Sequence, residues 1–263
     1  MRSGLLDCIH AFQFLPKCSV LRTLYYNFKL LPFRQAHKFP IAVGKNTIIK
    51  NTGDIIFDCS ISPFMVILGV STIPAFEDYS SKTKITNAGT IIIRNRINIH
   101  PGAKIWVEKG AELLFDGYNI IGAETKVACH KNIKIGKYSG CAWNCEIFDT
   151  DFHYTKDIVS GRIFDKNKEI VIGADVFIGN HVNIGKGTKL PDGSVVAAWS
   201  NVSGSFMKKS SAPFISGPKA DMIDSGYYIP HGYKMNIDVR YAKMFAEKKN
   251  RKNSKYKWNL YLV

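Results

Sequence analysis

The sequence predicts an all-β solenoid, and two observations carry this prediction. First, the stretch from Ile170 to Phe206 repeats every six residues, and the first position of each hexad is always aliphatic. These positions are Ile172, Ile178, Ile184, Leu190, Val196 and Val202. Second, the next position is always Gly, Pro, Ala or Ser. A short period with one aliphatic side chain per repeat is typical of stacked coils, in which each short strand buries that side chain against its neighbours.

Length and composition fit a globular chain of one large or two small domains, with 263 residues and 46% hydrophobic content. The sequence predicts neither a transmembrane span nor a signal peptide, so we expect a cytoplasmic location by default. The six cysteines show no C-x-x-C pair, and Cys141 and Cys145 fall on inward hexad positions. We therefore interpret the cysteines as reduced core thiols rather than as a metal or redox site.

The net charge of +15 is concentrated at the two ends of the chain. Basic and acidic residues number eight and one in residues 1–50, twelve and four in residues 207–263, and sixteen each between them. Such flanks indicate an anionic partner: cofactor phosphates, a nucleotide- or lipid-linked diphosphate, or an anionic membrane face. No nucleic-acid-binding motif accompanies the charge, so we expect no nucleic-acid partner.

Residues 1–40 are predicted to form an N-terminal amphipathic helical segment. Val20, Leu21, Leu24, Tyr25 and Phe28 follow the spacing of one helical face. Two hypotheses fit this pattern. The helix either lies on a membrane surface, or it caps the open end of the solenoid, which needs an apolar lid.

Residues 41–206 are predicted to form the solenoid. The part from 41 to 99 is rich in Ile, Val and Thr with tight-turn residues but lacks strict hexads, whereas the period emerges between residues 99 and 147. Residues 148–169 are polar and turn-rich, which is incompatible with a buried coil. We expect an excursion loop there, and functional residues are disproportionately placed on such loops. Residues 207–263 are predicted to be a C-terminal extension with a helix near 238–249 and a basic tail.

Residues 133–220 resemble the hexapeptide-repeat acyltransferases, in particular bacterial sugar and polysaccharide O-acetyltransferases. Three features carry the resemblance: the hexads, the Asp-x-Asp-x-His at 149–153 that ends a regular block, and the Gly-Pro-Lys-Ala at 217–220. Residues 24–33 also resemble the lead-in of surface-polysaccharide members. The resemblance implies a left-handed parallel β-helix. The handedness comes from the resemblance alone, since general sterics would favour right-handed crossovers. It also implies a homotrimer with acetyl-CoA as acyl donor.

His153 is the candidate general base. O-acetylation removes a proton from an acceptor hydroxyl as it attacks a thioester, and an imidazole titrates in the appropriate range. The family's catalytic histidine also falls at this place. The alternative is an ordinary exposed loop histidine, and His130 and His181 are competing imidazoles. Asp149 or Asp151 would orient the imidazole or bind the acceptor, and the sequence does not decide between them.

Other candidate site residues follow from the resemblance. Trp143 and Asn144, one coil from the loop, would line the acceptor pocket or simply form coil surface. Small residues of the last coils would admit the pantetheine arm of the donor, and lysines after them would meet its phosphates. The donor candidates are Gly179, Ala197, Ala198, Ser203, Lys208, Lys209 and Lys219. Phe177 takes the place of a common family Trp, Gly204 stands where many members have Lys, and Trp199 occupies a usually small position that could stack on adenine or pack between subunits.

The sequence thus predicts an acetyl-CoA-dependent O-acetyltransferase that modifies a saccharide, or a nucleotide- or lipid-linked sugar, in bacterial surface-polysaccharide synthesis. No metal is expected, because the histidines lack the close paired spacing of the β-helical carbonic anhydrases. An N-acetyltransferase acting on an amino sugar nucleotide or on serine is an alternative with the same base. A non-catalytic β-helix that docks to membrane or partner proteins is a second alternative, and it would bind no acetyl-CoA.

Overall fold

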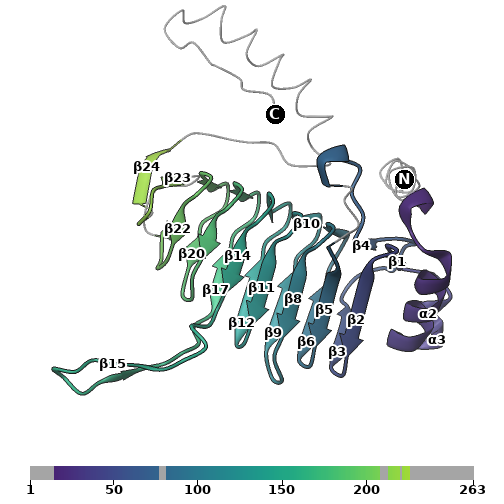
Figure 1. Ribbon diagram of the computed structural model, residues 1–263, viewed down its shortest axis with the longest axis horizontal. Helices are drawn as coiled ribbons and strands as arrows, with labels where there is room; N and C mark the ends of the chain where they lie inside the picture. The colour runs from purple at the N-terminus through teal and green to yellow at the C-terminus, as the bar shows by residue number, and fades with distance from the viewer. Residues whose placement is uncertain (1–14, 77–80, 208–212, 220, 226–263) are drawn as a thin grey trace, which may run out of the picture. The chain divides into compact units, whose positions relative to one another are not determined.

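The computed structural model describes residues 15–76, 81–207, 213–219 and 221–225. Three β-sheets form the walls of a prism, and each coil of the chain visits the three walls in turn (Figure 1). The first wall consists, in spatial order, of β1 (Ile41–Val43), β4 (Val66–Leu68), β7 (Ile97–Ile99), β10 (Asn119–Ile121), β13 (Gly140–Cys141), β18 (Phe177–Ile178), β21 (Val195–Val196), β23 (Pro213–Ser216) and β24 (Asp221–Ser225).

The second wall consists of β2 (Thr47–Asn51), β5 (Thr83–Asn87), β8 (Lys104–Val107), β11 (Lys126–Cys129), β14 (Glu146–Phe148), β19 (Asn183–Ile184) and β22 (Asn201–Val202). The third wall consists of β3 (Asp54–Phe57), β6 (Thr90–Ile93), β9 (Glu112–Phe115), β12 (Asn132–Ile135), β17 (Ile170–Ile172) and β20 (Lys189–Leu190). All pairings within these walls are parallel except that of β23 with β24. The predicted all-β solenoid, a three-sided parallel β-helix, is therefore confirmed.

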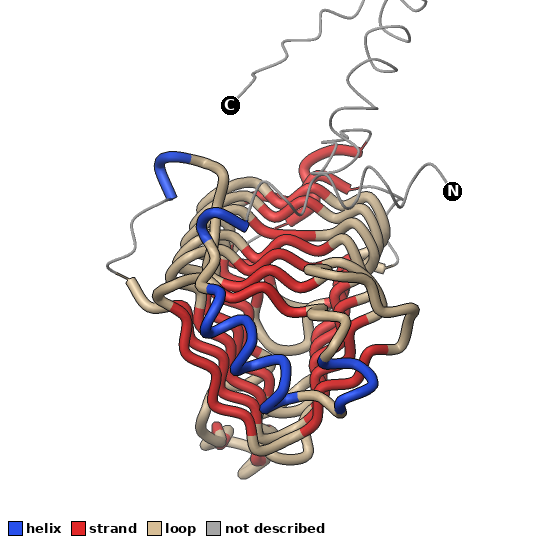
Figure 2. The backbone as a smooth tube through the Cα atoms, turned by 90° about the vertical axis from the view of Figure 1, so that its right-hand side faces the viewer, coloured by secondary structure: helices blue, strands red, loops and turns tan. Residues whose placement is uncertain are grey.

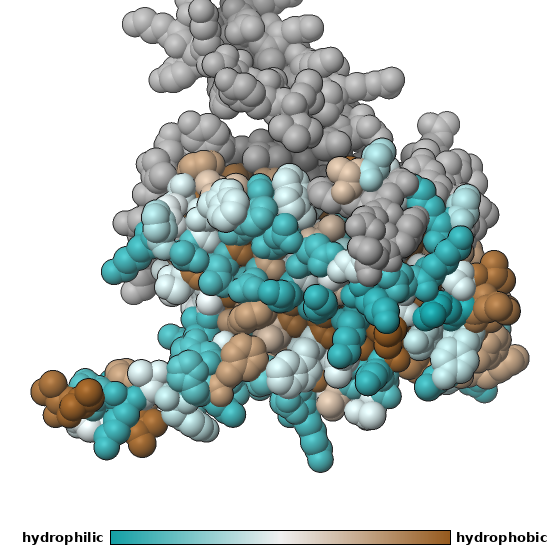
Figure 3. All heavy atoms as spheres, viewed as in Figure 1, coloured by the Kyte–Doolittle hydropathy of each residue, from teal (hydrophilic) through white to brown (hydrophobic). Residues whose placement is uncertain are grey.

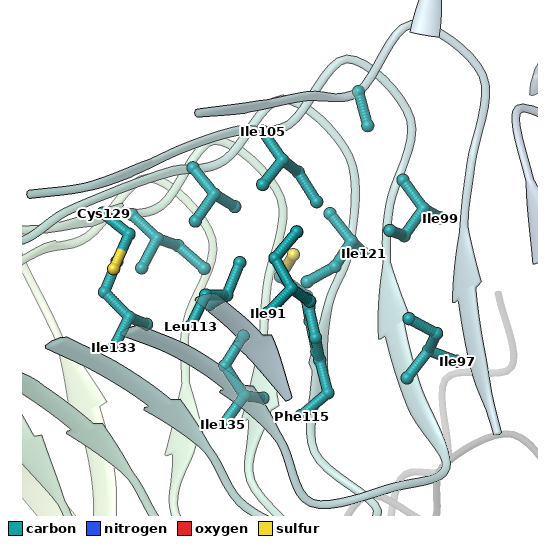
Figure 4. Close-up of a cluster of buried hydrophobic side chains, with 14 of the residues drawn as sticks. Ile91, Ile97, Ile99, Ile105, Leu113, Phe115, Ile121, Cys129, Ile133 and Ile135 are labelled. Carbon is teal, nitrogen blue, oxygen red and sulfur yellow. The ribbon is translucent and has the colours of Figure 1, made fainter. Parts of the chain in front are cut away.

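The hexads supply the core of the later coils. All six first positions are at most 1% exposed, and the fifth positions are at most 4% exposed. The fifth positions are Val176, Val182, Thr188, Ser194, Ser200 and Phe206. Earlier coils bury aliphatic side chains in the same way: Figure 4 shows Ile105, Leu113 and Ile133 pointing into one interior cluster. Such burial is the main stabilising contribution, roughly 2 kcal/mol for each large aliphatic side chain.

Coil length differs between the two ends of the solenoid. In the later coils a residue pairs with the residue 18 positions onward, as Asn183 does with Asn201. Between β5 and β14 the separation is 20 or 22, as between Lys84 and Lys104 or between Lys104 and Lys126. In the first coils it is larger and reaches 36, as between Thr47 and Thr83. Eighteen residues make three hexads, so a strict six-residue period exists only in the later coils.

Turns of the later coils require left-handed backbone at one hexad position. Five of the six fourth positions have positive φ: Asp175 (54°), His181 (57°), Gly187 (78°), Gly193 (70°) and Trp199 (62°). In the last hexad the residue before that position, Gly204, has it instead (86°). Glycine adopts this conformation freely, whereas another residue loses about 1 kcal/mol or more. His181 and Trp199 therefore occupy turns at a conformational cost, and both lie at the corner between the first and second walls.

Helix α2 (Val20–Leu30) closes the first coil, with η1 (Leu15–Lys17) before it and α3 (Phe33–Ala36) after it (Figure 2). Its N-cap is Ser19, whose hydroxyl accepts the backbone N–H of Arg22. The face turned to the coil combines the polar Thr23 and Asn27 with Tyr26, and all three are buried. Asn27 is fully buried, donates to the Ile41 carbonyl at 2.7 Å and accepts the Ile41 N–H at 3.1 Å.

The apolar face of α2 points outward. Val20, Leu21, Leu24, Tyr25 and Phe28 are all at least 40% exposed, and Figure 3 shows hydrophobic side chains over this end. A lid is therefore present, and it contacts the coil both through these hydrogen bonds and through Tyr26 and Leu30, which pack into the hydrophobic core. No helix among the described residues is long and apolar enough to cross a membrane.

The interval after Ser71 leaves the stack, with η2 (Pro74–Phe76) in it, before β5 begins at Thr83. The five described cysteines are free thiols, and Cys141 and Cys145 are buried as predicted. Burial raises the pKa of the Cys18 thiol to about 11. Cys8, the helix predicted near 238–249 and the basic tail lie outside the described residues.

Candidate active site

The predicted excursion leaves the prism between the second and third walls. After β14 ends at Phe148, two legs run out side by side and carry the hairpin of β15 (Thr155–Lys156) and β16 (Ile163–Phe164) (Figure 1). The legs are joined by backbone hydrogen bonds, including Asp151 N–H to the Lys166 carbonyl at 2.9 Å. The excursion is thus an ordered arm with a fixed base.

Asp149 fixes the base of this arm. Its carboxylate is fully buried and accepts the backbone N–H of His130 at 2.6 Å and that of Lys131 at 2.8 Å. Burial raises the pKa of the Asp149 carboxyl, and the hydrogen bonds from these backbone amides oppose the rise. The residue proposed to assist the base therefore binds the corner of the preceding coil, and its two oxygens are already engaged.

Asp151 ties the arm to the following coil. Its carboxylate lies 2.7 Å from the Lys186 ammonium, which also donates to the Asp165 carbonyl at 2.6 Å. Both legs are thereby held to the corner that contains Lys186. Because the ion pair is partly exposed, its contribution to stability is about 1 kcal/mol or less.

His153 is exposed at the foot of the arm. Among the described residues, no hydrogen bond or ion pair joins its imidazole to either aspartate, so both ring nitrogens are open to a substrate. The preceding residue, Phe152, has a φ of 63°, which is unusual for a bulky side chain, and its N–H donates to the Thr150 hydroxyl. Such strain persists only where the surroundings impose it, and it often marks functional positions.

An aromatic cluster holds Phe152 in this conformation. Its ring stacks on Trp106 at 6.1 Å and meets the edges of His130 at 5.3 Å and Phe148 at 5.8 Å. Trp106, Ala128 and Phe148 face each other across β8, β11 and β14, and the small Ala128 leaves room between the two large rings. The sequence analysis did not identify this cluster, because its column repeats every 20 or 22 residues.

The three candidate imidazoles differ in their surroundings. His130 lies within the aromatic cluster, and its Nε2 is buried without a hydrogen-bond partner among the described residues. The ring nitrogens of His181 lie 3.3 Å and 2.9 Å from the side-chain amides of Asn144 and Asn180. His130 and His181 are thus half-buried, whereas His153 is exposed.

The predicted acceptor residues Trp143 and Asn144 lie at a different corner, between the first and second walls. There Asn144, His181 and Trp199 form a column, and the last two rings stack at 4.1 Å. Trp199 is 69% exposed. Within a single chain, this column and the foot of the arm lie at opposite edges of the second wall. The three residues of β14 alone span about 10 Å of that distance.

Most predicted donor residues share the corner of that column. Gly179, Ala197 and Ala198 follow the strands of the first wall, and Lys219 is exposed after β23. The absence of a side chain at Gly179 serves the coil itself, because a Cβ there would lie 2.6 Å from the Ala198 backbone nitrogen. Ser203 is exposed at the excursion corner instead, and Lys208 and Lys209 lie outside the described residues.

No protein-family model matches the chain. An uncharacterised 24.8 kDa protein in the cps region of Klebsiella pneumoniae is 30% identical over 144 residues, which are 52% of this chain and 58% of that protein. The chain therefore spans little more than half of the relative that it matches.

Solved structures show more distant likenesses. The polySia-specific acetyltransferase NeuO is 20% identical with a TM-score of 0.45, over 77% of this chain and 99% of that chain. The polysialic acid O-acetyltransferase OatWY is 20% identical with a TM-score of 0.38, over 77% and 94%. A point mutant of the N-acyltransferase AntD from Bacillus cereus, in complex with dTDP-4-amino-4,6-dideoxyglucose and coenzyme A, is 15% identical with a TM-score of 0.40, over 80% and 89%. The strand pairing described above establishes the fold independently of these likenesses.

Proposed function

We propose that this protein is an O-acetyltransferase that moves an acetyl group from acetyl-CoA to a saccharide hydroxyl, with His153 as general base. The observation that carries the proposal is the exposed imidazole at the foot of an arm anchored on both neighbouring coils. Rigid elements that present one reactive side chain are what catalysis by positioning requires. The resemblance of residues 24–33 to surface-polysaccharide enzymes supports surface-glycan synthesis as the setting.

The chemistry needs few groups. The His153 imidazole takes the proton from the acceptor hydroxyl while the hydroxyl oxygen attacks the thioester carbonyl of acetyl-CoA. The carbon–sulfur bond then breaks, the acetyl group becomes an ester on the saccharide, and the imidazolium protonates the departing thiolate. The aromatic cluster at Phe152 keeps the foot of the arm in place during both proton transfers.

The substitution His153→Ala tests this function. We expect kcat for acetyl transfer to fall at least about 100-fold, because a positioned base typically contributes that much. The matched control is His37→Ala, which removes another exposed histidine, directly after α3, and should leave the rate unchanged. Full activity of the His153 variant across a panel of saccharides, or a comparable loss in His181→Ala alone, would contradict the assignment.

The active form is proposed to be a homotrimer. In one chain His153 and most donor candidates lie at opposite edges of the second wall, so a neighbouring subunit is needed to bring a donor corner to the arm. The hairpin supports this, because Ile158 and Val159 at its turn are 94% and 98% exposed, and Figure 3 shows a hydrophobic tip on the arm. Sedimentation equilibrium should give a trimer, and replacing residues 155–164 by a short turn should weaken it. A wild-type monomer that transfers acetyl groups would rule this out.

The outward apolar face of α2 is proposed to bind an anionic lipid surface. Five exposed apolar side chains lie on it, and the exposed cations Lys29 and Arg34 accompany them. This combination is typical of helices that lie in the membrane interface. Leu21→Gln with Phe28→Gln should abolish binding to vesicles that contain an anionic phospholipid, and Ile56→Gln, an exposed apolar residue of the third wall, should not. Equal binding by both variants would remove this proposal.

A further inference from the structure

The second wall carries a ladder of lysines on its outer surface. Lys84 pairs with Lys104, and Lys104 pairs with Lys126, on the adjacent strands β5, β8 and β11. Neighbouring strands are about 4.8 Å apart, and like charges directly opposite one another destabilise a sheet. Within the described part of the chain, only Lys126 of these three has a carboxylate partner, Glu146 at 2.8 Å. The arrangement is unfavourable unless an anion neutralises it.

A groove adjoins the ladder. It has a volume of about 500 Å³ and is lined by Ile48, Lys50, Ser81, Lys82, Lys84 and Lys104. None of the described residues that line it is acidic, and its four lysines form no ion pair with any other described residue. Residues 51–206 contain as many acidic as basic residues, so this gathering is local and does not reflect a general excess of charge.

The groove leads to the candidate base. Lys104 and Trp106 lie on the same face of β8, because residues two apart in a strand point the same way. Trp106 is 40% exposed and stacks on Phe152, the residue before His153. A ligand that runs from the lysines across the indole therefore arrives at His153.

We propose that this surface binds an acidic saccharide chain, with carboxylates among Lys50, Lys82, Lys84 and Lys104 and a sugar ring on Trp106. The proposal rests on acetyl transfer at His153 and names the substrate class for it. A single phosphate contacts only lysines within about 4 Å of its oxygens. Lys50, Lys84 and Lys104 lie on three neighbouring strands, roughly 10 Å across, and Lys82 directly precedes the middle one, which favours a ligand with several separated charges.

Calorimetric titration with oligogalacturonate tests the proposal, and its neutral methyl ester and pyrophosphate serve as comparison ligands. We expect oligogalacturonate to bind, with an affinity that falls as salt is added, and the methyl ester not to bind. Lys84→Gln with Lys104→Gln should weaken binding about tenfold. The matched control is Lys109→Gln with Lys134→Gln, two exposed lysines outside the groove that should have no effect. Equal loss in both double variants, equal binding of the methyl ester, or full displacement by pyrophosphate would overturn the proposal.

The binding experiment separates this inference from the proposed function. His153→Ala should retain oligogalacturonate binding, whereas Trp106→Leu should weaken it even where circular dichroism shows a native fold. Charge-dependent binding without acetyl transfer by the wild-type protein would defeat the function and leave the inference standing. Acetyl transfer to neutral saccharides that is unchanged in the Lys84 and Lys104 double variant would defeat the inference alone.

Discussion

The coils before the excursion and the coils after it build the same prism from different sequence patterns. Strands β17 to β22, after the excursion, are two or three residues long, and their register partners lie 18 residues apart, as for Asn183 and Asn201. Strands before the excursion reach five residues, and partners lie from 20 to 36 residues apart. The fold thus needs inward aliphatic side chains on each wall, whereas the six-residue period is one way of spacing them. The longer strands also carry more outward positions, and the lysines and Trp106 occupy these.

The largest expected effect tests whether the two sets of coils share one core. Ile105 and Ile184 are at most 2% exposed and belong to one hydrophobic cluster. Either residue changed to Ala should lower the free energy of unfolding by about 2–5 kcal/mol. Urea unfolding, followed by tryptophan fluorescence and circular dichroism, should show one transition in each variant.

Two unfolding transitions would instead show that the two sets of coils unfold separately. Solenoids are stabilised by contacts between neighbouring coils, so separate unfolding of one end is physically available to them. In that case Ile184→Ala would shift only the transition of the later coils, and the excursion would mark a boundary between two cooperative units.

An acid-induced loss of stability should arise from the earlier coils. His100 is buried there, and burial lowers its pKa to about 4. Between pH 6.5 and 4 the unfolded chain binds a proton that the folded chain does not, so stability falls as the pH is lowered through this window. The loss from this group reaches about 3 kcal/mol near pH 4. Unfolding free energies at pH 7 and pH 4 should therefore differ by less in His100→Gln than in the wild type, and an unchanged difference would exclude His100 as the cause.

The smallest expected loss of stability comes from substitutions in single turns, one in each set of coils. Gly110 and Gly204 have φ values of 78° and 86°, and a Cβ at either would meet no atom within 4 Å. Substitution by Ala should therefore cost about 1 kcal/mol at each, from the left-handed backbone alone. Asn tolerates this conformation better and should cost less than Ala. Thermal unfolding midpoints check both, and a larger loss at one position would reveal a contact specific to that turn.

The sequence was sufficient to predict the later coils, since every inward hexad position is buried, and to predict the excursion at 148–169. It was not sufficient to predict the aromatic cluster around Phe152 or the lysine ladder of the second wall. Lys84, Lys104 and Lys126 become neighbours only once the lengths of the earlier coils are known, and those lengths depend on irregular corners. The pairing of Asp149 with the backbone of His130 was hidden for the same reason, because it joins residues of successive coils.

Helix α2 shows a second limit of pattern analysis. Its apolar spacing was predicted correctly, but the direction of that face was not determined by the pattern. Hydrophobic periodicity normally identifies the buried side. In α2 the buried side instead combines Tyr26 with the polar Thr23 and Asn27, because backbone groups of Ile41 and Val43 in the first coil need hydrogen-bond partners.

The paired legs of the excursion have a consequence for how such proteins diversify. Thr150 and Asn167 bridge each other, so the two points where the arm leaves and rejoins the solenoid are adjacent in space. Closing a loop between adjacent points depends only weakly on its length, with about 0.6 kcal/mol for each doubling. Segments of different length and composition can therefore be exchanged at this corner with little thermodynamic penalty, and the coils on either side need no compensating substitution.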